Sequence, residues 1–339
     1  MLSKASLFKH RIVRRGLGVG AAIAMLLLSY LVYAWSVGLD TSDKIYTVKP
    51  GTTLKSFTRE LHRDGLLPDR FSMVWLSYLR GQHRSLKVGE YRFKSGVSQR
   101  ELLDIVTSGR SIQYALLIPE GWNFREVMQA LNSAEKLEHT LKGLSANMVM
   151  EQLGKAGIHP EGRFFPDTYY YTAGTSDRVL MQQAFARMEQ RLASEWAERE
   201  KDLPYKTPYE ALIMASIVEK ETGVPQERPE IAGVFVNRLR IGMRLQTDPT
   251  VIYGVGESFD GNLRRRDLRR DTPYNTYTRK GLPPTPIAMP GGDAIHAALH
   301  PAKTEYLYFV SRGDGSHYFS STLKEHQNAV VKYQLGGKK

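Results

Sequence analysis

An uncharged segment near the N-terminus constrains this chain more than any other feature. Residues 16–39 contain no Asp, Glu, Lys or Arg. At ~1.5 Å per residue, a helix of this length reaches across the ~30 Å hydrocarbon core of a bilayer. Aromatic side chains near its end suit the membrane interface: Tyr30, Tyr33 and Trp35. The sequence therefore predicts one transmembrane helix over residues 16–39.

The flanking charges predict the orientation of this helix. Five Lys or Arg residues lie within residues 1–15, whereas Asp40 and Asp43 follow the apolar segment. The positive-inside bias therefore predicts a cytoplasmic tail at residues 1–15 and export of the remainder of the chain. A cleaved signal peptide is the alternative, because residues 34–36 (AWS) form an acceptable cleavage site. The apolar segment is longer than a signal-peptide core, so we expect an uncleaved anchor.

Composition removes several functional classes. None of the 339 residues is a cysteine, so disulfides, thiol catalysis and thiolate metal sites are excluded. The net charge of +12 favours acidic partners. The densest basic cluster, residues 263–271, lacks interleaved aromatic residues for base stacking, and we expect no nucleic acid as partner. Two interpretations of this cluster remain. It is a solvated basic loop, or it contacts an anionic polymer or lipid surface.

The sequence after the apolar segment predicts two domains. Between residues 45 and 109, two rounds of short strand, turn and helix indicate a small α/β module. Pro119 interrupts the chain before a helical pattern that begins at Phe124. We therefore place a small domain at residues 40–118 and a larger mixed α/β domain at residues 119–339. The predicted fold class is α+β.

One helix in the larger domain should be buried. Residues 207–210 (TPYE) predict its start, with the threonine as N-cap and the glutamate reaching back to that cap. Residues 211–218 are apolar except for one serine, so the helix should lie in the core, and Gly223 is expected to end it. Glu219 shares a face with the apolar residues, which is an unusual place for a carboxylate.

Two interpretations of this carboxylate stay open from the helix alone. Glu219, Lys220 and Glu221 can form the solvated last turn of a core helix. Alternatively, Glu219 is a proton donor, because the negative end of the helix dipole and an apolar wall both disfavour its ionised form.

Two loop-like segments follow, at residues 245–254 and 272–292. Their Pro, Gly, Thr, Asn and Tyr content predicts irregular structure rather than core helices, and long irregular loops commonly carry function. Their amides, hydroxyls and aromatic rings suit binding of a sugar chain. The candidate binding residues are Gln246, Thr247, Asp248, Asn275, Thr276 and Tyr277. Asp248 and Asn275 can equally be caps of turns.

Motifs for cofactors and metals are missing from the sequence. No P-loop, G-x-G-x-x-G after a strand, G-x-S-x-G or H-E-x-x-H occurs. His296 and His300 have an i, i+4 spacing, but His300 precedes Pro301 and no H-E-x-x-H glutamate accompanies the pair. We expect these histidines to be helix-end residues, and we predict neither a metal nor a cofactor.

Five segments carry a resemblance to a known family. In chain order they are EGRFFPDTY, ASIVEKET, FVNRLRIGMRLQTDPTVIYG, PYNTYTRKGLPP and HPAKTEYLYFV. Behind one anchor, they closely resemble the endolytic murein transglycosylase (YceG-like) family over nearly the whole chain. The resemblance implies that residues 40–118 are a LysM-like domain, that Glu219 is the catalytic acid, and that the polar loop residues line a glycan groove. The segment TPIAMPGG departs from the family pattern, and nothing is transferred from it.

The resemblance also implies a reaction and a location. Glu219 would protonate the oxygen between N-acetylmuramic acid and N-acetylglucosamine, then accept the proton of the muramoyl C6 hydroxyl as that hydroxyl attacks C1. Cuts within peptidoglycan strands would leave 1,6-anhydro ends and terminate nascent strands. The implied location is the bacterial inner membrane, with the catalytic domain in the periplasm. The implied partners are glycan strands, the cytoplasmic membrane and peptidoglycan synthases.

Two alternatives remain. A lysozyme-like hydrolase needs a second carboxylate ~5 to 9.5 Å from the first. Glu221 should point to another helix face than Glu219, whereas Asp248 stays open as that partner. A non-catalytic, membrane-anchored scaffold that binds the cell wall would tolerate the loss of Glu219.

Overall fold

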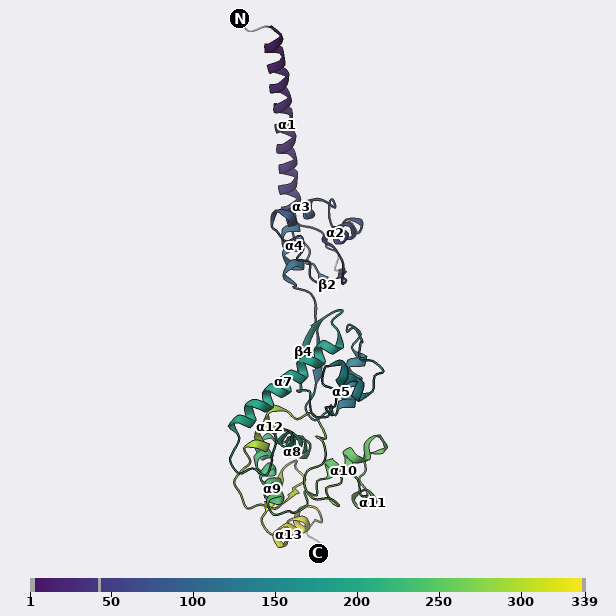
Figure 1. Cartoon of the computed structure of the whole chain (residues 1–339), viewed down its shortest axis with the longest axis vertical. Coiled ribbons are helices and arrows are strands. Elements are labelled where there is room, and N and C mark those ends of the chain that lie inside the picture. Colours follow the sequence, from purple (N-terminus) through teal and green to yellow (C-terminus); the bar gives the residue numbers. More distant parts are fainter. Residues whose placement is uncertain (1–3, 42–43, 337–339) are drawn as a thin grey trace. The chain divides into compact units, whose positions relative to one another are not determined.

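The computed structural model describes residues 4–41 and 44–336, which form two compact units (Figure 1). The first unit comprises Met1–Tyr114 and Thr172–Thr175, and the second comprises Ala115–Tyr171 and Ser176–Lys339. Helices and two-stranded sheets occur together in the chain. The predicted α+β class and the single N-terminal apolar helix are therefore confirmed, while the LysM-like identity of residues 40–118 stays a prediction.

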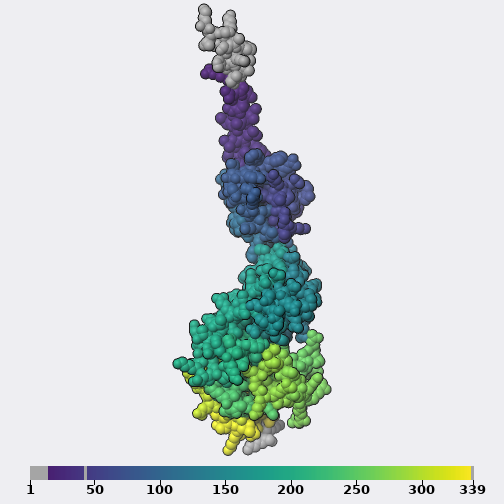
Figure 2. Space-filling model, in the orientation of Figure 1, coloured from purple at the N-terminus to yellow at the C-terminus, as the bar shows by residue number. Residues whose placement is uncertain are grey.

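Helix α1 (Lys4–Ser36) contains the apolar segment. Its portion Arg14–Ser36 is long and apolar enough to cross a membrane. Figure 2 shows the described side chains of this helix, in purple, as a rod that emerges from the first unit. Only the last turns enter the unit, where Ala34 and Trp35 are buried.

The first unit packs three helices on one small sheet. Its elements after α1 are β1 (Ile45–Val48), α2 (Leu54–Arg63), α3 (Ser72–Leu79), β2 (Gly89–Arg92) and α4 (Gln99–Ser108). Strands β1 and β2 are antiparallel, with Ile45 opposite Arg92 and Val48 opposite Gly89. Phe57, Tyr91 and Leu103 are fully buried between the sheet and the helices.

The second unit is mainly helical. Its elements are β3 (Gln113–Ile118), α5 (Phe124–Ser133), α6 (Ala146–Gln152), β4 (Asp167–Thr172), α7 (Asp177–Glu198), α8 (Pro208–Glu221), η1 (Pro225–Glu227), α9 (Arg228–Arg240), α10 (Asp248–Val255), η2 (Gly256–Ser258), α11 (Arg265–Arg269), α12 (Gly292–Leu299), β5 (Tyr308–Ser311), β6 (His317–Ser320) and α13 (Leu323–Tyr333). β3 pairs with β4, and β5 pairs antiparallel with β6. Helix α8 packs against α12, α9 and α7 in the centre of the core (Figure 1).

The structure confirms the start of α8 and corrects its end. The hydroxyl of Thr207 accepts a 3.2 Å hydrogen bond from the amide of Glu210, as an N-cap does. The carboxylate of Glu210 accepts from the amide of Lys206, one residue before the predicted cap. The helix ends at Glu221 because Thr222 is extended (φ −142°, ψ 136°), so the prediction that Gly223 ends it was wrong.

One of the two irregular segments is also corrected. Residues 248–255 form α10, with Pro249 as its second residue and Thr250 and Val251 buried. A proline in the first helical turn needs no amide partner, and burial of the next turn stabilises the helix. Residues 272–291 contain no regular helix or strand.

Candidate active site

Glu219 lies in the last turn of α8, at the edge of the buried core. Its side chain is 7% exposed. Burial is the main influence on this carboxyl, and it raises the pKa of Glu219 above the ordinary value of a glutamic acid. A carboxyl in this setting keeps its proton to a higher pH, as a general acid requires.

A main-chain amide holds one oxygen of this carboxyl. The N–H of Gly291 donates a 2.9 Å hydrogen bond to Oε2 of Glu219. This bond favours the ionised form and offsets part of the pKa rise. Gly291 ends the irregular segment 272–291 and is the N-cap of α12. Gly291 belongs to the segment TPIAMPGG, to which the family resemblance assigned no role. This segment therefore supplies a contact to the carboxyl of Glu219.

Arg228 brings three carboxylates together. Its guanidinium lies 3.5 Å from Oε1 of Glu219, 3.7 Å from Oε2 of Glu120 and 3.2 Å from Oδ2 of Asp293. The negative charge of Glu120 raises the pKa of Glu219, whereas the positive charges of Arg228 and Lys220 lower it. The protonation of Glu219 therefore depends on a small network of charges and not on burial alone.

The side chain of Glu120 lies against Gly291 and would have to move if a larger residue stood there. A Cβ atom at Gly291 would lie 1.9 Å from Oε1 of Glu120. The ammonium of Lys220 donates a 3.2 Å hydrogen bond to the carbonyl of Gly121, which fixes the same loop to the end of α8. Sequence reasoning did not single out Glu120, Arg228 or Gly291, because their proximity arises only from packing of separate segments.

Glu221 faces a different environment from Glu219. It is partly buried, accepts a hydrogen bond from the hydroxyl of Thr247, and has its pKa raised by desolvation to about 7. The charge of Asp248 raises this pKa further, and that of Arg238 lowers it. Glu221 therefore faces the segment before α10, on another face of α8.

The six candidate binding residues fall into two groups by exposure. Gln246 and Asp248 are exposed and Tyr277 is half-buried. The phenol of Tyr277 donates a 2.5 Å hydrogen bond to Asp248, which joins the two segments. Thr247, Asn275 and Thr276 are buried.

The buried group holds the loops in shape. The side-chain amide of Asn275 donates to three main-chain carbonyls, those of Asp267, Leu268 and Arg270, at 3.3, 3.0 and 2.7 Å. The hydroxyl of Thr276 accepts from the amide of Thr247 at 3.1 Å. These bonds fix loop conformation rather than leaving the side chains free for a ligand.

A cavity of about 760 Å³ lies beside the carboxyl network. Its lining includes Gly121 and Lys220, the neighbours in sequence of Glu120 and Glu219, together with Tyr253, Tyr274 and other residues. Aromatic rings next to a carboxylate network offer both stacking and proton transfer to a sugar ligand.

Glu161 is a buried carboxylate on the wall of this cavity. It accepts a 3.0 Å hydrogen bond from the amide of Phe124 and a 2.9 Å bond from the phenol of Tyr253. Burial raises the pKa of Glu161 to about 7. Glu161 belongs to the segment EGRFFPDTY, but the sequence predicted no role for this residue. The two bonds tie the start of α5 to α10.

The two histidines of α12 lie beside another glutamate. Possible ligand atoms of Glu195, His296 and His300 all lie within 4.8 Å of one another. Nδ1 of His296 is 2.9 Å from Oε2 of Glu195, and the two imidazole rings stack. Arg191 pairs with the other oxygen of Glu195 at 2.8 Å, so a positive charge already neutralises the carboxylate.

Comparison with known proteins identifies relatives of the chain. The model of the YceG-like family matches residues 46–332. A relative from Bacillus subtilis (strain 168), named endolytic murein transglycosylase, is 32% identical over 304 residues, covering 84% of this chain and 83% of the relative. A relative of the same name from Streptococcus pneumoniae serotype 2 is 26% identical over 333 residues, covering 87% of this chain and 60% of the relative.

A solved structure gives the same result. The crystal structure of a YceG-like protein from Listeria monocytogenes is 27% identical and covers 84% of this chain and 98% of its own, with a TM-score of 0.53. The resemblance carried by the five sequence segments is confirmed, and the chain belongs to the YceG-like family of endolytic murein transglycosylases.

Proposed function

We propose that this protein is a membrane-anchored lytic transglycosylase that cuts peptidoglycan strands internally, between N-acetylmuramic acid and N-acetylglucosamine. The observation that carries the proposal is Glu219, a nearly buried carboxyl with a raised pKa beside a cavity lined by aromatic residues. The names of the relatives support the substrate and the reaction class.

Glu219 acts twice in the proposed reaction. As an acid, it gives its proton to the glycosidic oxygen while the bond to C1 breaks. As a carboxylate, it then accepts the proton of the muramoyl C6 hydroxyl while that oxygen bonds to C1, and the acid is regenerated. The hydroxyl belongs to the same sugar, so its effective concentration is high and water need not be positioned. The amide of Gly291 and the guanidinium of Arg228 stabilise the carboxylate between the two steps.

Hydrolysis is the alternative, and one observation gives it a specific candidate. Glu120 and Glu219 lie 3.7 and 3.5 Å from the same guanidinium nitrogen of Arg228, so the two carboxylates are neighbours. Glu221 and Asp248 lie in a separate group near Thr247. Glu120 is therefore the first residue to test as a base that activates water.

The candidate binding residues take two roles in this proposal. Gln246, Asp248 and Tyr277 contact the glycan, because they are exposed or half-buried. Thr247, Asn275 and Thr276 keep the two segments in the conformation that presents them. The LysM-like domain predicted at residues 40–118 would grip a further part of the strand.

The apolar part of α1 supports the proposed anchor. Residues 1–15 lie in the cytoplasm, and the second unit acts in the periplasm, where nascent strands are made. Cuts within new strands would end their elongation, which makes peptidoglycan synthases the expected partners.

Mass analysis of products from purified glycan strands tests the proposal. Internal fragments with 1,6-anhydro-muramoyl ends, one water lighter than hydrolytic products, are expected. Reducing muramic ends would identify a hydrolase, and Glu120→Gln would then be the first variant to examine. Binding without any cleavage would instead identify a wall-binding scaffold.

A further inference from the structure

Helix α3 in the first unit has its polar and apolar residues on the wrong sides for an ordinary surface helix. Its sequence, SMVWLSYL, contains no charged residue. Two serines are buried together with a methionine and a leucine: Ser72, Ser77, Met73 and Leu76. The exposed residues are large and mainly apolar, with exposed fractions of 57%, 60%, 50% and 72%: Phe71, Trp75, Tyr78 and Leu79. Contiguous exposed apolar groups of this kind mark an interaction surface.

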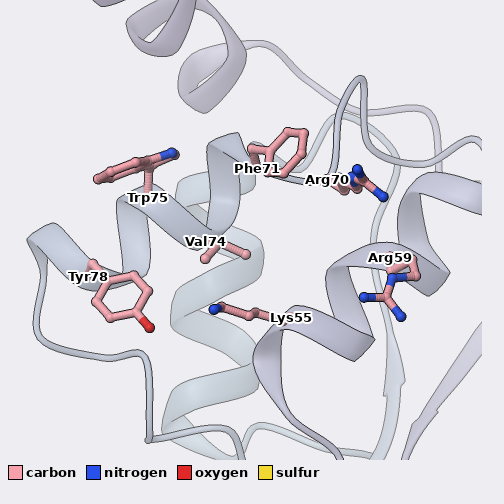
Figure 3. A pocket seen from close by; sticks show the side chains of 7 residues that line it. All are labelled: Lys55, Arg59, Arg70, Phe71, Val74, Trp75 and Tyr78. Atoms are coloured by element: carbon pink, nitrogen blue, oxygen red, sulfur yellow. The ribbon is translucent and has the colours of Figure 1, made fainter.

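Basic side chains border this apolar face. Lys55 and Arg59, one turn apart on α2, and Arg70 line a hollow of about 590 Å³ together with Phe71, Val74, Trp75 and Tyr78. Figure 3 shows these side chains around the space between α2 and α3. The lining has positive charge and aromatic rings but no carboxylate or amide side chain. It therefore matches an anionic and apolar partner.

Two hydrogen bonds tie the start of α3 to the apolar helix α1. The indole N–H of Trp35 donates to the carbonyl of Ser72 at 2.8 Å. The phenol of Tyr30 donates to Oδ2 of Asp69 at 2.7 Å. The loop before α3 therefore lies at the level of Tyr30, which is within the apolar part of α1.

The length of α1 sets where a bilayer would end. The part from Gly16 to Tyr33 lies outside the core of the unit except for Leu31, which packs against it, and full burial begins at Ala34. This part of the helix is ~27 Å long at ~1.5 Å per residue, close to the ~30 Å of a hydrocarbon core. The membrane surface would then lie near Tyr33, with α3 beginning at that level.

We propose that the exposed face of α3 inserts into the outer-leaflet interface of the membrane that α1 spans, while Lys55, Arg59 and Arg70 contact anionic lipid headgroups. This inference rests on the membrane anchor of the proposed function. Aromatic residues are favoured at the boundary between headgroups and acyl chains, and basic residues are attracted to anionic lipids. Continuity with α1 also supports a bilayer, because the anchor already holds this face beside the lipid and no separate encounter is needed.

A glycan strand is a poorer match for this face. Sugar recognition uses amide and carboxylate groups in addition to aromatic rings. Besides its cations, the face supplies only the hydroxyl of Tyr78 and the indole N–H of Trp75, and Leu79 is strongly exposed. Insertion of α3 would fix the tilt of the first unit against the membrane.

The absence of cysteine allows a direct test on the full chain. The single-cysteine variants Trp75→Cys and Leu79→Cys each carry a nitroxide label. Each variant is reconstituted in phosphatidylcholine vesicles with and without phosphatidylglycerol. Relative collision rates with oxygen, which partitions into lipid, and with an aqueous nickel complex report the depth of each label. Leu27→Cys, within the apolar helix, and Lys49→Cys, an exposed residue after β1, are matched controls.

The expected result is that labels at positions 27, 75 and 79 favour oxygen and the label at 49 favours nickel. Aqueous labels at 75 and 79 with a membrane-buried label at 27 would overturn the docking of α3 and leave the anchor intact. An aqueous label at 27 would overturn the anchor and the docking together. Protection at 75 and 79 that needs added glycan strands would assign the face to glycan and also overturn the proposal.

Charge reversal tests the basic border separately. In the chain labelled at position 75, the label should lie deeper in vesicles that contain phosphatidylglycerol than in vesicles that lack it. The double variant Arg59→Glu with Arg70→Glu should reduce this difference in depth. An unchanged difference in depth would show that these arginines do not contact anionic headgroups. Both arginines are exposed, so the variants are expected to fold. The circular dichroism spectrum of the variants should match that of the parent, which shows that they fold.

Discussion

Glu219 accepts a 2.9 Å hydrogen bond from the main-chain amide of Gly291, a residue 72 positions later in the chain. The bond joins the end of α8 to the start of α12, the two helices that pack most extensively in the second unit. A small movement of either helix would therefore alter the proton affinity of the carboxyl. This coupling links core packing to the acid–base chemistry proposed for Glu219.

Glu219→Gln is expected to abolish glycan cleavage while the fold is retained. The amide keeps the shape of the side chain but cannot carry the proton in either direction, and loss of a general acid typically costs ~10²- to 10⁴-fold in rate. Product release from purified strands measures the rate, and circular dichroism checks the fold. Glu221→Gln is the matched control and should have a much smaller effect, because Glu221 faces Thr247. Equal damage from both variants would contradict the assignment.

Glu120→Gln should move the alkaline limb of the pH–rate profile to lower pH. The charge of Glu120 raises the pKa of Glu219, and removing it makes Glu219 lose its proton more easily. The profile of kcat/KM against pH, measured on soluble strands, gives the shift. Arg228→Gln should shift the same limb in the opposite direction, since Arg228 lowers this pKa. A limb that does not move in either variant would show that another group controls it.

Gly291→Ala should reproduce the effect of Glu120→Gln. The new Cβ would lie 1.9 Å from Oε1 of Glu120, so the half-exposed Glu120 side chain must swing away from Glu219. The backbone of Gly291 (φ −74°) accepts alanine without strain. Combining Gly291→Ala with Glu120→Gln should give little further shift of the alkaline limb. Gly223→Ala, where no atom lies within 4 Å of the new Cβ, is the control.

The sequence predicted those features of the site that depend on local chemistry. The N-cap at Thr207 follows from side-chain and main-chain groups three residues apart. The burial of Glu219 agrees with one of the two interpretations that the helix left open, since the residue shares a face with apolar residues. Both depend on neighbours within one or two turns of helix, and both are found in the structure.

The sequence did not predict the remaining features. Some of them arise only from tertiary packing, and for α10 the amino-acid composition favoured a different interpretation. Arg228 and Gly291 reach Glu219 only because α9 and α12 pack on α8, which no local pattern reveals. Helix α10 did have a local signal, since Pro249 follows Asp248, but the polar composition of its surroundings favoured a loop. The end of α8 depends on the extended backbone of Thr222, whose hydroxyl accepts from the amide of Val224 at 3.0 Å.

The topology of the anchor can be tested independently of the enzyme. Basic residues before Gly16 and the apolar helix after them predict a cytoplasmic N-terminus and an exported C-terminus. A phosphatase reporter that is active only after export should therefore be active when fused after Lys339. A reporter that works only in the cytoplasm would contradict this orientation. A mature N-terminus near Val37 would show a cleaved signal peptide instead of an anchor.

Stability of the second unit should fall as the pH rises through neutrality, partly because of Glu221. The folded pKa of Glu221 is about 7, above the value of 4.5 for a free side chain, so the folded state holds its proton more tightly. The resulting stabilisation is complete below about pH 4.5 and is lost as the pH rises through about 7, up to about 3 kcal/mol. Glu221→Gln cannot ionise and should flatten this part of the curve of unfolding free energy against pH.

Denaturant unfolding from pH 5 to 8 provides the measurement. The free-energy difference between the parent and Glu221→Gln should change across this range, with the variant gaining relative stability at the alkaline end. Glu161→Gln should behave similarly, because burial raises the pKa of Glu161 to about 7 as well. Glu257→Gln, at an exposed carboxylate, is the control and should track the parent. A parallel offset of the Glu221→Gln curve at every pH would mean that Glu221 is ionised in the folded state across the whole range, contrary to the raised pKa that its burial beside Thr247 causes.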